Sequence, residues 1–160
     1  MNKIIGILGM QVAITEHQEI LIQIPHTKTR IVKTAKDLDC IDGLILPGGE
    51  STAIGKLLDY FSLKEILQQK IISGLPVFGT CAGLILLAKN IENQTNTHLA
   101  TMDITVKRNG YGSQLDSFST NLLIPTIDKN MPIPLVFIRA PYITKTDKDV
   151  QILATLDNKI

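Results

Sequence analysis

The sequence has no tryptophan, only two cysteines and almost no net charge. Lysine and arginine number 16 against 15 aspartate and glutamate residues, giving a formal charge of +1. This balance gives no electrostatic reason to expect nucleic acid or an anionic membrane as a partner. No apolar run approaches the roughly 18 residues of a membrane span. Cys40 and Cys81 form neither a C-x-x-C motif nor a disulfide framework, which indicates a reducing, cytoplasmic environment.

What is present fits a globular protein. The chain has 160 residues, 44% hydrophobic and 19% charged, which excludes a disordered chain and predicts a single domain over residues 1–160. The first residues, MNKIIGILGMQVAI, place one lysine before an apolar run but have no small-residue cleavage pattern. We therefore interpret them as a buried first strand and not as a signal peptide.

Short apolar segments alternate with segments of helical spacing. Residues 3–10 and 42–49 end in glycine-containing turns and are typical of strands buried on both faces of a parallel sheet. Residues 51–74 predict one broken or two short helices, with Gly74 as the C-cap. Further helices are expected within 12–24 and 82–91, and strands at 29–33, 75–79, 102–108, 117–125, 135–140 and 150–156. The alternation predicts an α/β three-layer sandwich with a mostly parallel central sheet.

The segment VFGTCAGLILLA places Cys81 between Gly79 and Gly83, after a strand and before a helix. One interpretation is a small buried core residue. The other is a nucleophile elbow, in which flanking glycines allow a tight turn and close packing of strand and helix. At the helix N-terminus the thiolate would be favoured, and the Ala82 amide would face an oxyanion formed on an attacked carbonyl. The G-x-C-x-G string alone fits both interpretations.

A second stretch, LILPGGEST, ends a strand with two glycines and then begins a helix. Such a turn lies at the carboxyl edge of an α/β sheet, where its amides can complete an oxyanion hole and receive a carboxylate. A phosphate-binding P-loop is excluded, because five residues separate Gly49 from Gly55 and Leu57, not serine or threonine, follows Lys56.

These stretches, together with RNGYG, QLDSF and VFIRAP, resemble the glutaminase subunits of pyridoxal 5′-phosphate synthase, which are class I glutamine amidotransferases with a flavodoxin-like fold. The resemblance implies that Cys81 attacks the side-chain amide of glutamine. Ammonia is then released, and water hydrolyses the remaining glutamyl thioester. It implies no cofactor and no metal.

The resemblance also assigns roles to individual positions. The Gly49 and Ala82 amides would form the oxyanion hole. The substrate-binding residues would be Gly49, Glu50, Ser51, Arg108, Ile138 and Arg139. Simpler explanations exist for some of these residues: Glu50 also fits a helix cap, and each arginine fits a surface ion pair. Cys40 is interpreted as structural.

The implied partner is a ring-forming synthase subunit that receives the ammonia within a large heteromeric complex. Gln11 and His17 are the residues assigned to its interface, although His17 also fits an ordinary helix surface. The chain departs from the family pattern at three places. Val12 replaces a usual glycine, and Gly110 and Tyr142 replace the commoner serine and histidine.

The largest departure is an absence. The family supplies a base and its orienting group from a late His-Pro-Glu element. Residues 1–160 contain no His-Pro-Glu, and no His-x-Glu follows Cys81. His98 is the only histidine after Cys81. We therefore expect a truncated or degenerate subunit without turnover, in which residues 150–160 begin a hairpin around Asp157-Asn158. The alternatives are a non-catalytic binding module and the glutaminase of another amidotransferase, such as imidazole glycerol phosphate synthase. The DNA that follows the Ile160 codon distinguishes an active subunit from a degenerate one.

Overall fold

The computed structural model describes residues 2–11, 13–112 and 114–160, and the chain forms two compact units. The first comprises Met1–Lys89 and Asn96–Met102, and the second comprises Asn90–Thr95 and Asp103–Ile160. Val12, one of the departures from the family pattern, lies outside the described residues.

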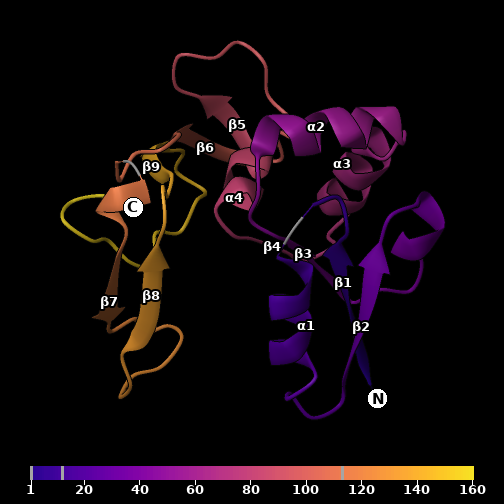
Figure 1. Ribbon diagram of the computed structural model, residues 1–160, viewed down its shortest axis with the longest axis horizontal. Helices are drawn as coiled ribbons and strands as arrows, with labels where there is room; N and C mark the ends of the chain where they lie inside the picture. Colours follow the sequence, from indigo (N-terminus) through magenta and orange to yellow (C-terminus); the bar gives the residue numbers. More distant parts are fainter. Residues whose placement is uncertain (1, 12, 113) are drawn as a thin grey trace. The chain divides into compact units, whose positions relative to one another are not determined.

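The first unit is built on a parallel sheet of four strands (Figure 1). Their order is β2-β1-β3-β4, and each neighbouring pair is parallel. The strands are β1 (Lys3–Leu8), β2 (Thr27–Val32), β3 (Gly43–Leu46) and β4 (Val77–Gly79). Every residue of β3 is buried, as expected for a central strand covered on both faces. The parallel sheet predicted from the short apolar runs is confirmed.

The helices of this unit are α1 (Ile14–Leu21), α2 (Ser51–Tyr60), α3 (Lys64–Ile72) and α4 (Ala82–Leu87), with a 3-10 turn, η1, at Ala35–Leu38. Residues 51–74 therefore form two helices. Gly74 ends α3 with φ +102°, and the Leu75 N–H donates to the Lys70 carbonyl, which is the glycine C-cap expected from the sequence. The core is made largely of leucines: Leu8, Leu38, Leu44, Leu46, Leu58, Leu63, Leu67, Leu86 and Leu99.

The helix predicted over 82–91 is wrong in its second half, since α4 ends at Leu87 and Ala88–Ile91 is strand β5. The cause is a later loop. The Leu86 carbonyl accepts the Leu99 N–H at 2.9 Å, and the Leu87 carbonyl accepts the Thr101 N–H at 2.9 Å. These carbonyls would otherwise accept from the next helical turn. Residues more than ten positions away thus end a helix that the local pattern favours.

Two strand pairs of the second unit are antiparallel. Strand β6 (Met102–Lys107) lies between β5 and β9 (Tyr142–Thr146), and β6 and β9 are antiparallel. A separate hairpin joins β7 (Phe118–Leu122) to β8 (Ile133–Phe137), and a 3-10 turn, η2, covers Gln114–Asp116. The strand predicted at 150–156 is not formed. Only the turn is confirmed there, where Leu156 and Lys159 bridge around Asp157 and Asn158, both at positive φ.

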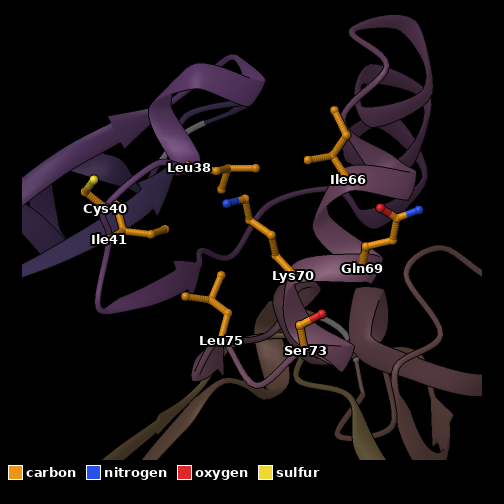
Figure 2. A pocket seen from close by; sticks show the side chains of 8 residues that line it. All are labelled: Leu38, Cys40, Ile41, Ile66, Gln69, Lys70, Ser73 and Leu75. Carbon is orange, nitrogen blue, oxygen red and sulfur yellow. The ribbon is translucent and has the colours of Figure 1, made fainter.

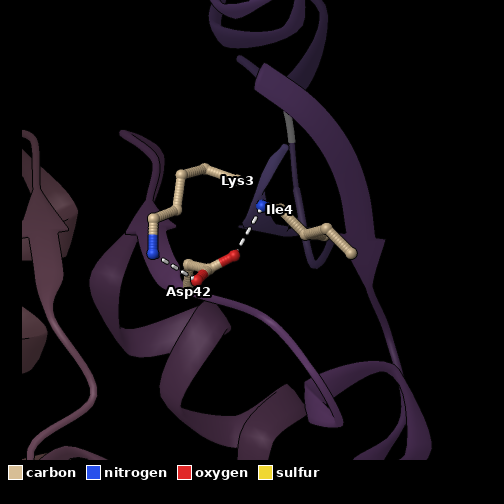
Figure 3. Close-up of polar contacts among 3 residues, drawn as sticks. All are labelled: Lys3, Ile4 and Asp42. Carbon is tan, nitrogen blue, oxygen red and sulfur yellow. Dashed lines mark hydrogen bonds and ion pairs between the residues drawn. The ribbon is translucent and has the colours of Figure 1, made fainter. Parts of the chain in front are cut away.

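A carboxylate joins the start of β1 to the start of β3. Asp42 accepts from the Lys3 ammonium at 2.7 Å and from the Ile4 N–H at 2.8 Å (Figure 3). The hydrogen bond from Lys3, followed by that from Ile4, lowers the pKa of Asp42. Because the folded-state pKa is depressed, the stabilisation is present above the ordinary value of about 3.9 and is lost as the pH falls through the folded-state value.

We expect Asp42→Asn to lower the urea midpoint at pH 7, and we expect the gap from the unsubstituted protein to narrow on acidification to about pH 3. Equilibrium urea unfolding at both pH values measures this gap. Asp149→Asn, at an exposed carboxylate, is the control. If the difference in urea midpoint between the two proteins is the same at both pH values, the Asp42 charge does not contribute to the stability of the fold.

Candidate functional site

Cys81 lies at the sharp turn between β4 and α4. Its backbone has φ +49° and ψ −104°, a conformation that costs energy in any residue with a side chain, and its thiol is exposed. The exposure excludes the alternative that Cys81 is a small core residue. Strand, strained turn and helix together form the geometry of a nucleophile elbow.

The two glycines that flank the cysteine allow this turn. A Cβ on Gly83 would lie 2.1 Å from the Leu46 carbonyl oxygen of β3, and one on Gly79 would lie 2.7 Å from the Gly83 carbonyl carbon. Neither distance is physically possible, because real Cβ contacts do not fall below 3.0 Å. Helix α4 therefore packs directly on the strand backbone, as the spacing predicts.

The loop between β3 and α2 lies beside the cysteine. A Cβ on Gly48 would be 3.6 Å from the Cβ of Cys81. Gly49 follows at φ +150°, and a Cβ there would meet the Gln11 side-chain oxygen at 2.6 Å. That same oxygen accepts the Glu50 N–H at 2.8 Å. Gln11, assigned from the sequence to a partner interface, thus also holds this loop.

Two backbone amides near the elbow are free to donate. Within the part of the chain that the structure describes, neither the Gly49 N–H nor the Ala82 N–H donates a hydrogen bond. Ala82 is the first residue of α4, where helix amides have no partner within the helix. Both amides assigned to the oxyanion hole can therefore serve an added acceptor.

The residues after Gly49 form the start of α2. Glu50 is the N-cap, and its carboxylate accepts from the Thr52 N–H at 3.1 Å and the Ala53 N–H at 2.7 Å. The helix-capping explanation for Glu50 is thus confirmed, whereas its contact with a substrate stays a prediction. Ser51 is buried, and its hydroxyl has no hydrogen-bond partner among the described residues.

Arg108, Ile138 and Arg139 all belong to the second unit. Arg108 follows β6 and is half-buried, while Ile138 and Arg139 follow β8 and are exposed, Arg139 at φ +46°. Their role in binding substrate stays a prediction.

Sequence reasoning missed one contact in this unit. A Cβ on Gly110 would lie 2.2 Å from the Tyr142 ring, so the ring occupies the space of a side chain at position 110. The two departures from the family's serine and histidine are therefore one packing arrangement. Their joint occurrence was the available signal.

His98, the histidine downstream of Cys81, packs against helix α2 of the first unit. A Cβ on Gly55 would lie 2.2 Å from its Nδ1 atom, so the imidazole rests on the helix where no side chain intervenes. The structure thus gives His98 a packing role.

Helix α1 presents the other residue assigned to the partner interface. His17 is half-buried, and desolvation lowers its pKa, against an opposing contribution from the Glu16 charge. Beyond it, Ile20, Ile22 and Ile24 are exposed. No residue of α1 is fully buried.

Among the described residues, no helix is long and apolar enough to span a membrane. In the same residues, no group of three or more histidine, cysteine, aspartate or glutamate side chains is placed to hold a metal ion.

Comparison with known proteins places this geometry in a family. The chain is 50% identical over 158 residues to a protein of Ruminiclostridium cellulolyticum named pyridoxal 5′-phosphate synthase subunit PdxT, covering 99% of this chain and 83% of that one. It is 51% identical to a protein of the same name from Carboxydothermus hydrogenoformans, covering 98% and 81%. A crystal structure titled glutamine amidotransferase superposes with a TM-score of 0.85 at 34% identity, over 97% of this chain and 81% of that chain. The family model for SNO glutamine amidotransferases matches residues 7–160. The chain therefore belongs to the SNO glutamine amidotransferase family.

Proposed function

We propose that this protein is the glutaminase subunit of a pyridoxal 5′-phosphate synthase and acts on L-glutamine through Cys81. The observation that carries the proposal is an exposed cysteine in a strained elbow, with the β3–α2 loop beside it. Family membership and the names of relatives about 50% identical support the same function.

In the proposed reaction, the Cys81 sulfur attacks the side-chain carbonyl carbon of glutamine. The negative charge that forms on the carbonyl oxygen is stabilised by the Gly49 and Ala82 amides. The tetrahedral intermediate then expels ammonia, which takes up a proton as it leaves, and a glutamyl thioester remains. Water hydrolyses the thioester to glutamate and regenerates the thiol.

Substrate orientation requires groups that recognise an amino acid. Arg108 would pair with the α-carboxylate, because a guanidinium donates two parallel hydrogen bonds to a carboxylate. Glu50 and Ser51, at the start of α2, would bind polar atoms of glutamine. Ile138 and Arg139 are the remaining residues proposed to contact the substrate.

The proton transfers require a base, and no His-x-Glu follows Cys81 in residues 1–160. We therefore propose that a polypeptide of residues 1–160 binds glutamine and presents the nucleophile but releases no ammonia. Loss of one member of a catalytic triad typically removes several orders of magnitude of rate. Measurable turnover by this polypeptide would make His98 the first residue to substitute.

The proposed partner is the synthase subunit that consumes the ammonia within a large ring-shaped complex. Gln11 and His17, with the exposed Ile20 of α1 and Ile22 and Ile24 just after it, form the proposed contact surface. Exposed large apolar side chains close together in the chain support a surface that another protein covers.

The test is alkylation of the two thiols. We expect iodoacetamide at neutral pH to modify Cys81 before Cys40, although both are exposed, because Cys81 is the proposed nucleophile and lies in the strained turn before α4. Glutamine is expected to slow the reaction at Cys81 and not at Cys40. Peptide mass spectrometry over a time course gives both rates.

Cys40→Ser and Cys81→Ser serve as paired controls, each leaving one thiol to be followed. Asparagine, one methylene shorter than glutamine, controls for protection by any amino acid. Faster modification of Cys40, or equal protection by both amino acids, would contradict the assignment of Cys81 as nucleophile.

A further inference from the structure

The strongest unassigned feature is a cavity at the opposite edge of the first unit's sheet from Cys81. It has a volume of about 490 Å³ and lies between the turn that precedes β3 and the end of α3 (Figure 2). β3 and β4 are parallel and begin just after this cavity, whereas Cys81 follows the end of β4. A ligand here would not contact the elbow.

The walls of the cavity are largely apolar. Leu38 is fully buried, and Ile41, Ile66 and Leu75 are partly buried and pack against the leucine core. The volume and the apolar walls match small-molecule sites, which typically enclose about 300–1,000 Å³ and carry only a few polar groups. The cavity therefore suits the apolar body of a small ligand.

One cation reaches into these walls. Figure 2 shows the Lys70 side chain extending from α3 toward Leu38 and Ile41. Its only ion pair among the described residues joins its ammonium to an Asp39 carboxylate oxygen at 3.7 Å, which is too long for a hydrogen bond. The Asp39 side chain is 67% exposed. An acceptor within hydrogen-bond distance would bind this ammonium more closely than Asp39 does. The exposed Asp39 side chain can then rotate toward solvent.

Two further polar side chains, Gln69 and Ser73, line the cavity near the end of α3 and carry both donors and acceptors. The Gln69 carbonyl accepts the Ser73 N–H at 2.9 Å, and the Lys70 carbonyl accepts the Leu75 N–H at 3.0 Å. Arg30 donates to the Asp39 carbonyl and adds positive charge beside Asp39.

We propose that this cavity binds a small organic carboxylate, whose apolar body lies against Leu38, Ile41, Ile66 and Leu75 and whose carboxylate pairs with Lys70. A charge-assisted hydrogen bond to the ammonium supplies the selectivity for the anion. The site does not involve glutamine or Cys81, so its test is independent of the proposed glutaminase activity.

The experiment titrates residues 1–160 with 4-phenylbutanoate and with its neutral amide, followed by ¹H–¹⁵N NMR. The carboxylate is expected to cause saturable shifts at Cys40, Lys70 and Leu75, and to bind about tenfold or more tightly than the amide. Lys70→Met, which keeps the apolar stem, is expected to abolish that difference. Lys64→Met is the matched control, because Lys64 lies on the same helix outside the cavity and pairs with Asp59.

Shifts located elsewhere, no saturable shift, or equal weakening by both lysine variants would each overturn the proposal. A second measurement does not depend on the Lys70 variant folding. In a Cys81→Ser background, the carboxylate is expected to slow alkylation of Cys40, which is one of the lining residues, and the amide is expected to slow it less. Equal alkylation rates with and without the carboxylate would also overturn it.

Discussion

Replacing Gly83 by alanine is expected to destabilise the first unit by about 3 kcal/mol or more, because overpacking against backbone leaves no side chain to move aside. The added Cβ would lie 2.1 Å from the Leu46 carbonyl oxygen and 2.9 Å from the Leu46 Cβ. Relief requires α4 to move off β3, which would also displace Cys81 at the start of that helix. Urea unfolding, followed by far-UV circular dichroism, measures the loss.

Gly43→Ala is the matched control for this experiment. Gly43 is also buried on β3, but a Cβ there would meet its nearest neighbours, Ile5 and the Pro76 carbonyl, at 3.5 and 3.6 Å, which are ordinary contacts. We expect this variant to change stability by less than about 1 kcal/mol. If both alanine variants lose the same stability, the close approach of α4 to β3 is not what requires glycine at position 83.

Replacing Gly110 by serine is expected to destabilise the second unit by about 1–3 kcal/mol, the usual cost of an overpacked side chain. The added Cβ would lie 2.2 Å from the Tyr142 ring, which packs edge-on against Tyr111 at 5.7 Å and lies under the Lys159 ammonium at 5.1 Å. The ring cannot move without losing these contacts. Tyr142→His supplies a smaller ring and, with serine at position 110, gives the residue pair that the family resemblance implies.

We expect the double variant Gly110→Ser/Tyr142→His to recover much of this loss, with a coupling free energy of about 1 kcal/mol or more. Urea unfolding of the four proteins in the double-mutant cycle measures the coupling. Gly110→Ser combined with Tyr60→His is the control, because Tyr60 is exposed in the other unit. Additive losses at positions 110 and 142 would show that the two positions vary independently.

Much of the fold and the central feature of the site were predictable from sequence because their causes are local. The parallel strands follow from short apolar runs bounded by turn residues, and the division of residues 51–74 into two helices follows from the Phe61–Leu63 break and the Gly74 cap. The elbow at Cys81 follows from two glycines four residues apart between a strand and a helix. Residues near one another in the chain define each of these features.

The remaining features depend on residues that are distant in the chain. Strand β5 replaces the end of a helix because residues 99–101 occupy the last carbonyls of α4, and β9 exists because β6 lies beside it. Glu50, whose amide donates to the Gln11 side chain, lies 39 positions after Gln11. The Tyr142 ring fills the space at Gly110, and the cavity around Lys70 is lined both by the turn before β3 and by the end of α3. The sequence by itself determined the strands of the parallel sheet and the elbow, because periodicity and turn chemistry act between neighbouring residues. Only the tertiary structure decided these contacts and the cavity, because they depend on which segments, distant in the chain, pack against one another in the folded protein.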